Sequence, residues 1–109
     1  MTHQHTASIQ LHCSASGLRQ FLGHTANLPR ISDPELELEI VRAPVDVELG
    51  QEIEFRITAY GFKQRATNRY TCVTDLEIAE EQIDGPLRAW KHRQQITPHD
   101  DGTVTLTDE

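Results

Sequence analysis

The feature that most constrains the fold of this chain is an alternation of apolar and polar residues with a period of two. In residues 35–40, three aliphatic side chains alternate with three glutamates, and residues 53–59 repeat the alternation. Residues 63–74 are rich in Thr, Tyr and Val and contain neither Pro nor Gly, which is typical of a long strand. Because successive side chains of a strand point to opposite faces, this pattern predicts a sheet with one buried face.

The alternation and the turn signals between its runs divide the chain into seven candidate strands. Short connections between consecutive strands predict an antiparallel meander. The run Asp100-Asp101-Gly102 is a hairpin signal before the last strand. The seven candidates are residues 7–13, 35–40, 53–59, 63–74, 76–84, 87–97 and 103–108.

Two short helices are expected between the first and second strands, which makes the fold class α+β. Ser14 and Ser16 are both suitable N-caps for a helix that carries Leu18 and two further apolar residues at helical spacing. Gly23 is expected to end this helix in a left-handed cap. Residues 25–31 predict a second short helix, interrupted by a proline.

Length and composition favour one small domain. A chain of 109 residues matches a single domain, and 37% hydrophobic residues are enough for a thin, sheet-based core. Residues 1–6 are polar and predict a disordered tail, so the domain is expected to span residues 7–109. The sequence has no run near the ~20 apolar residues of a membrane span and no signal peptide, which predicts a cytoplasmic protein. Cys13 and Cys72 match no metal spacing and are expected to be reduced thiols.

The charge balance argues against a nucleic-acid partner. Ten Lys and Arg residues oppose 17 Asp and Glu residues, so the net charge is −7 with neutral histidines. An acidic chain with scattered basic residues repels phosphate backbones. No metal or cofactor is expected, because the six histidines are dispersed and the chain has no phosphate-binding Gly-rich loop. His3 and His5 near the terminal amine suit copper or nickel, but a flexible tail explains them equally well.

Two motifs carry a resemblance to a known family. Residues Asn27–Ser32 read NLPRIS, and residues Glu80–His92 read EEQIDGPLRAWKH. With these motifs and this order of elements, the chain resembles the helix-grip fold of the START-like superfamily, also called SRPBCC, and within it a bacterial branch of uncharacterised ligand-binding members. The superfamily includes polyketide cyclases, pollen-allergen-type carriers and lipid-transfer domains. The resemblance covers nearly the whole chain and implies a curved antiparallel sheet around an apolar ligand.

The sequence departs from these relatives at two places. Relatives continue past the position of Glu109, finish the seventh strand and add a long C-terminal helix that closes the cavity. The resemblance therefore implies a C-terminally incomplete domain with an uncovered sheet face. An aromatic residue that relatives often carry early in the fourth strand is also absent, with Ala66 near that point. An uncovered sheet exposes an apolar patch and an unpaired edge, so a homo-oligomer is expected.

The candidate site residues centre on one strand face. Period two places Trp90, His92 and Gln94 on one face, and the resemblance implies that this face looks toward the cavity. Glu80 and Gln82 share a face of the preceding strand and can reach His92. A Trp packed within the sheet and a His bonded to a carboxylate are the commoner, structural uses of these residue types. The full predicted ligand-binding set is Phe55, Ile57, Tyr70, Glu80, Gln82, Trp90, His92 and Gln94.

Three functions are compatible with these observations. The first is non-catalytic binding of a small hydrophobic molecule by a carrier or sensor. The second is a polyketide cyclase or dehydratase in which His92 or Glu80 moves protons, although the sequence offers no second catalytic group and assigns no catalytic residue. The third is a structural role, in which another chain completes the sheet. The resemblance makes the first the leading hypothesis, and because fold alone does not fix function, it needs evidence from the site itself.

Overall fold

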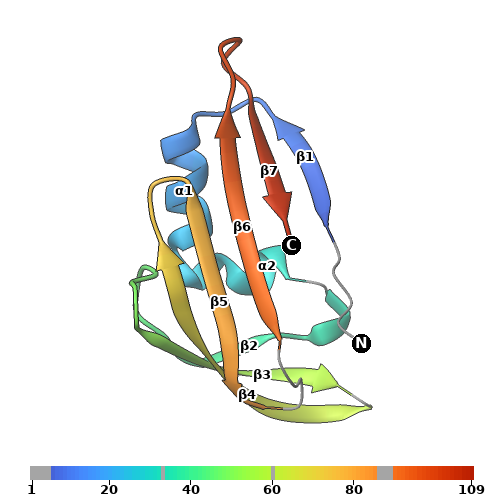
Figure 1. Ribbon diagram of the computed structural model, residues 1–109. Helices are drawn as coiled ribbons and strands as arrows, with labels where there is room; N and C mark the ends of the chain where they lie inside the picture. The colour runs from blue at the N-terminus through green and yellow to red at the C-terminus, as the bar shows by residue number, and fades with distance from the viewer. Residues whose placement is uncertain (1–5, 33, 60, 86–89) are drawn as a thin grey trace.

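The computed structural model describes residues 6–32, 34–59, 61–85 and 90–109, and these form one seven-stranded antiparallel sheet with short helices (Figure 1). The strand order is β1-β7-β6-β5-β4-β3-β2, so β2 to β7 form a meander and β1 pairs with β7. The predicted α+β class and antiparallel meander are confirmed. The strands are β1 (Ala7–Leu11), β2 (Glu39–Arg42), β3 (Glu52–Ala59), β4 (Phe62–Val73), β5 (Glu77–Asp84), β6 (Lys91–Pro98) and β7 (Val104–Asp108).

The second strand is shorter than the alternation predicts. A 3-10 turn, η2 (Pro34–Leu36), occupies the start of the predicted strand, and β2 begins only at Glu39. Glu37 between them has a φ of 48°, a left-handed conformation that interrupts a strand. Leu36 and Leu38 still pack against the core. The alternation therefore predicted which side chains face the core, but not the backbone conformation that directs them there.

Other strand limits differ from the prediction by a few residues. The first strand ends at Leu11, although Cys13 still packs against the core. The sixth begins at Lys91, and the predicted start at residues 87–89 lies outside the described residues. The predicted hairpin between β6 and β7 is present, and Gly102 takes the positive φ of 84° that its turn requires.

The helical segment between β1 and β2 begins with α1 (Ala15–Gly23), followed by a 3-10 turn, η1 (Thr25–Asn27), and α2 (Leu28–Ile31). Ser14 is the N-cap of α1, because its hydroxyl accepts a hydrogen bond from the Gly17 N–H at 3.0 Å. Pro29 was expected to interrupt this second helix, but it does not. It lies in the first turn of α2, where a missing N–H costs nothing.

The prediction of a left-handed cap at Gly23 is wrong. Gly23 is the last residue of α1, and the capping residue His24 has an extended backbone. Gly23 instead packs closely against its neighbours, since a Cβ on Gly23 would lie 3.3 Å from Cγ2 of Val47 and would displace the end of the Arg19 side chain. The Val47 N–H donates a 2.8 Å hydrogen bond to the Gly23 carbonyl, which fixes this approach.

The sheet curls around the helical segment, and the core lies on the concave side. In Figure 1, β2 and β3 run across the lower ends of the upright strands β5 and β6. Register shifts between β4 and β5, on both sides of residues 68–70, mark bulges that increase twist and bending at this point. Leu18 and Leu22 of α1 pack onto buried residues of the sheet such as Ile53, Phe55 and Ile96. No helix in the described part of the chain is long and apolar enough to cross a membrane.

Candidate ligand-binding site

A cavity of about 270 Å³ lies between the concave face of the sheet and the segment from α1 to β2. This volume is close to the lower end of the ~300–1,000 Å³ that is usual for small-molecule pockets. All eight residues of the predicted ligand-binding set line it. They are Phe55 and Ile57 of β3, Tyr70 of β4, Glu80 and Gln82 of β5, Trp90, which precedes β6, and His92 and Gln94 of β6. The structure thus brings together every predicted site residue, whereas their binding of a ligand stays a prediction.

One side of the cavity is apolar. Its wall combines Leu22 and Leu28 of the helical segment, Leu38 before β2, and Ile53 and Ile57 of β3. The period of two directs alternate residues of β3 into the cavity, while α1 contributes a residue of its buried stripe. This side offers a ligand a mainly aliphatic surface, and the hydroxyl of Ser32, which also lines it, already donates to the Leu28 carbonyl.

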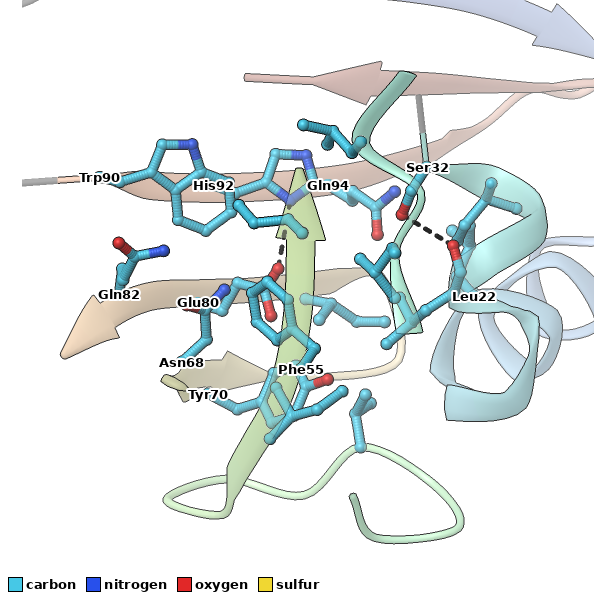
Figure 2. Close-up of a pocket in the computed structure, with 18 of the residues that line it drawn as sticks. Leu22, Ser32, Phe55, Asn68, Tyr70, Glu80, Gln82, Trp90, His92 and Gln94 are labelled. Atoms are coloured by element: carbon cyan, nitrogen blue, oxygen red, sulfur yellow. Dashed lines mark hydrogen bonds and ion pairs between the residues drawn. The ribbon is translucent and has the colours of Figure 1, made fainter. Parts of the chain in front are cut away.

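The opposite side is a polar row that crosses three strands. The register places Tyr70 of β4 opposite Glu80 of β5, and Glu80 opposite His92 of β6. One step along the same faces, Asn68 lies opposite Gln82, whose N–H donates to the Trp90 carbonyl at 3.0 Å. Figure 2 shows these side chains grouped on one side of the cavity, with the ring of His92 above the carboxylate of Glu80. Cross-strand neighbours on one face lie about 5 Å apart, so the row forms a continuous polar strip.

His92 lies between two carboxylates. Its Nδ1 is 3.6 Å from an oxygen of Glu80, and its Nε2 makes a short hydrogen bond with Oδ1 of Asp108 in β7. Burial by itself would lower the pKa of His92, but the hydrogen bonds and charges of Asp108 and Glu80 outweigh burial and raise it to about 9. His92 is therefore an imidazolium at neutral pH. The indole of Trp90 stacks on its ring, with centroids 5.6 Å apart and an angle of 22° between the planes.

Two buried polar atoms of the row have no hydrogen-bond partner among the described residues. They are the Tyr70 hydroxyl and Oδ1 of Asn68, on residues that are 2% and 1% exposed. Burial and the nearby charge of Glu80 raise the pKa of Tyr70, so its hydroxyl stays protonated. An unsatisfied buried polar group costs about 1–3 kcal/mol, and such atoms at the wall of a cavity are suited to a bound polar group.

Sequence reasoning missed three polar residues at this cavity. Asn68 shares a face with Tyr70 at a spacing of two, and this spacing could have identified it. Asp108 alternates within β7, but only the pairing of β6 with β7 brings it to His92. Ser32 follows α2, where its hydroxyl donates to the Leu28 carbonyl at 2.7 Å. No sequence pattern indicated that the end of this short helix faces the sheet.

The charged residues of the site do not form a metal centre. Among residues 6–32, 34–59, 61–85 and 90–109, no group of three or more His, Cys, Asp or Glu side chains could hold a metal ion. His3 and His5, the residues weighed for copper or nickel, lie outside the described residues. The site therefore offers hydrogen bonds and charge, and no arrangement of ligands for a metal.

The architecture is shared with known proteins. No family model matches the sequence, and no curated protein sequence matches it. Among solved structures, a START superfamily protein from Mycobacterium smegmatis superposes with a TM-score of 0.71 at 12% identity, over 94% of this chain and 71% of that chain. A major latex-like protein from Panax ginseng superposes with a TM-score of 0.61 at 10% identity, over 95% of this chain and 76% of that chain.

A protein from Chromobacterium violaceum also superposes with a TM-score of 0.61, at 12% identity, over 95% of this chain and 78% of that chain. The chain therefore has the START-like helix-grip fold that the two sequence motifs implied. At identities of 10–12% this likeness shows the fold alone. Ligand and activity have to be argued from the cavity.

Proposed function

We propose that this protein binds a small, largely apolar molecule in its cavity and performs no chemistry on it, as a cytoplasmic carrier or sensor. The observation that carries the proposal is the cavity itself, with an aliphatic wall facing a strip of polar groups. Binding sites for small molecules combine these features, since the apolar wall supplies affinity and a few polar groups fix orientation. The two free thiols, Cys13 and Cys72, are consistent with a reducing compartment.

Trp90 is the residue on which we would test this function first. It is the single tryptophan of the chain, it lines the cavity, and its ring covers His92. An aromatic ring at a cavity wall contributes a large contact area to a bound ligand. The variant Trp90→Ala should therefore weaken binding of a neutral apolar probe such as N-phenyl-1-naphthylamine by about tenfold or more.

The measurement is a fluorescence titration of the probe, followed by mass spectrometry of any small molecule released from purified, denatured protein. Phe62→Ala is the matched control, because Phe62 is an exposed aromatic residue that does not line the cavity. The control should bind the probe as the wild type does. A folded Trp90→Ala variant with unchanged affinity would refute the placement of the ligand, and a wild type that binds no apolar probe would refute the function.

One observation favours a second candidate, a polyketide cyclase or dehydratase-like activity. His92 lies between Glu80 and Asp108, and the hydroxyl of Tyr70 is in the same row. With a pKa of about 9, His92 would donate a proton or stabilise a negative charge, and it would not serve as a base at neutral pH. The reaction needs a general base as well, which is why we rank binding first. Turnover of a polyketide-like substrate that survives His92→Gln would exclude this use of His92.

A further inference from the structure

The positive and negative charges of the side chains that line the cavity do not sum to zero. This net charge points to the kind of head group that the cavity accepts. Among the described lining residues, Glu80 and Asp108 are acidic, His92 is basic, and none is Lys or Arg. With His92 protonated between the two carboxylates, this set carries one net negative charge. A buried charge that is not neutralised is costly, so a ligand with one positive charge would complete the set.

The position of the uncompensated charge follows from burial and pairing. The Asp108 side chain is 47% exposed and forms the short hydrogen bond to His92, so water and the imidazolium both stabilise it. The Glu80 side chain is only 15% exposed, and its one hydrogen-bond or ion-pair partner among the described residues is His92, at 3.6 Å. Glu80 therefore retains the capacity to accept further hydrogen bonds inside the cavity.

A second, independent observation lies next to Glu80. Oδ1 of Asn68 is buried at the cavity wall without a partner, and the Tyr70 hydroxyl, which can also accept a hydrogen bond, is equally unpartnered. Tyr70 is the cross-strand neighbour of Glu80, and Asn68 is two residues from Tyr70 on the same face of β4. Figure 2 shows the Asn68 side chain beside that of Glu80, both on the polar side of the cavity. The three residues place hydrogen-bond acceptors along the same polar side of the cavity.

From this arrangement, and resting on the proposed function, we infer that the ligand is an amphiphilic amine, whose ammonium group binds Glu80, Asn68 and Tyr70 while its apolar body packs against the wall around Ile53 and Ile57. An ammonium group has three N–H donors and no acceptor, which matches this set of acceptors. A carboxylic acid of the same size would place a second uncompensated anion beside Glu80.

The test compares three probes that share one apolar body and differ in the head group. We would titrate the protein with 4-phenylbutylamine, 4-phenylbutanol and 4-phenylbutyrate at pH 7.5 by isothermal calorimetry. We expect the amine to bind at least tenfold more tightly than the acid, which corresponds to about 1.4 kcal/mol, with the alcohol between them. An acid that binds as tightly as the amine, or more tightly, would overturn the inference.

Matched variants locate the preference. Glu80→Gln removes the charge from the cavity, and it should reduce the affinity for the amine about tenfold while leaving that for the alcohol within about threefold. Glu81→Gln removes the same charge from the neighbouring residue, which does not line the cavity, and should change neither value. Amine binding that resists Glu80→Gln, or falls equally in Glu81→Gln, would exclude the assigned position.

The outcomes separate this inference from the proposed function. If all three probes fail to bind the wild type, the cavity does not act as a small-molecule site, and the proposed function fails together with the inference. If the alcohol or the acid binds best, the cavity binds small molecules and only the assignment of the amine fails. The order of affinities in the wild type decides this point even if Glu80→Gln does not fold.

Discussion

The position of His92 between two carboxylates predicts how the stability of the fold depends on pH. Asp108 and Glu80 raise the pKa of His92 from 6.5 to about 9 although burial opposes them. Because the pKa is higher in the folded than in the unfolded state, the stabilisation is complete below about pH 6.5 and is lost as the pH rises through about 9. Linkage gives about 3 kcal/mol at pH 6.5, about 2 kcal/mol at pH 7.5 and about 0.4 kcal/mol at pH 9.

The perturbation that isolates this contribution is His92→Gln, which keeps a hydrogen-bonding side chain and removes the titrating charge. We would measure the free energy of unfolding by urea denaturation between pH 6.5 and 9 for both proteins. The wild type should lose about 2.5 kcal/mol more than the variant over this range, and subtracting the two curves removes the contributions of other titrating groups. With 27% of the His92 side chain exposed, screening by solvent makes this figure an upper value.

The control is His12→Gln, because His12 is exposed and does not line the cavity. This variant should follow the wild-type curve. If wild type and His92→Gln changed in parallel between pH 6.5 and 9, the pKa of His92 would not be raised by folding. If the wild type gained stability relative to the variant as the pH rose, the sign of the argument would be wrong.

Three further predictions test the cavity and its frame. Tyr70→Phe removes a buried hydroxyl without a described partner. In urea denaturation the ligand-free variant should therefore be about 1–2 kcal/mol more stable than the wild type, and it should bind the amine probe more weakly. A loss of stability would indicate that the hydroxyl already has a hydrogen-bond partner. Gly23→Ala should change the stability by less than about 1 kcal/mol, because the gain in helix propensity offsets the displacement of the Arg19 guanidinium and a slight adjustment of Val47. A larger loss in the midpoint of thermal unfolding would indicate that Val47 cannot adjust. The homo-oligomer is predicted to form through the uncovered sheet, to which the edge strands β1 and β2 add the exposed residues Ile9 and Val41. A monodisperse monomer in light scattering at high concentration would contradict it.

The amine inference and the predicted gain in stability for Tyr70→Phe rest on one trade-off. Unsatisfied polar atoms such as the Tyr70 hydroxyl and Asn68 Oδ1 cost stability in the ligand-free fold. In the inferred complex with an amine, the ligand supplies partners for these atoms, and a molecule without donor groups would leave them unpaired. A variant that is more stable and binds less well would demonstrate this trade-off directly.

The sequence by itself determined the strand faces. The period of two is a local property of an extended chain, so it correctly placed His92 with Gln94, and Glu80 with Gln82, on faces that meet at the cavity. The caps were less certain from sequence, because Ser14 and Ser16 were equal candidates and Gly23 has its role through Val47, 24 residues away. Leu36 and Leu38 were correctly predicted to face the core, although Leu36 lies in a 3-10 turn and Leu38 just before β2.

Only the tertiary structure decided how the site is connected. The pairing of β6 with β7 brings Asp108 to His92. The bulges between β4 and β5 bend the sheet at Asn68 and Tyr70, whose Oδ1 and hydroxyl have no hydrogen-bond partner among the described residues. These features depend on register and curvature, which arise from contacts between segments far apart in the sequence. Alternation fixes the face on which a side chain lies. Which faces meet decides where the charged side chains of the cavity and the buried atoms without a described partner lie.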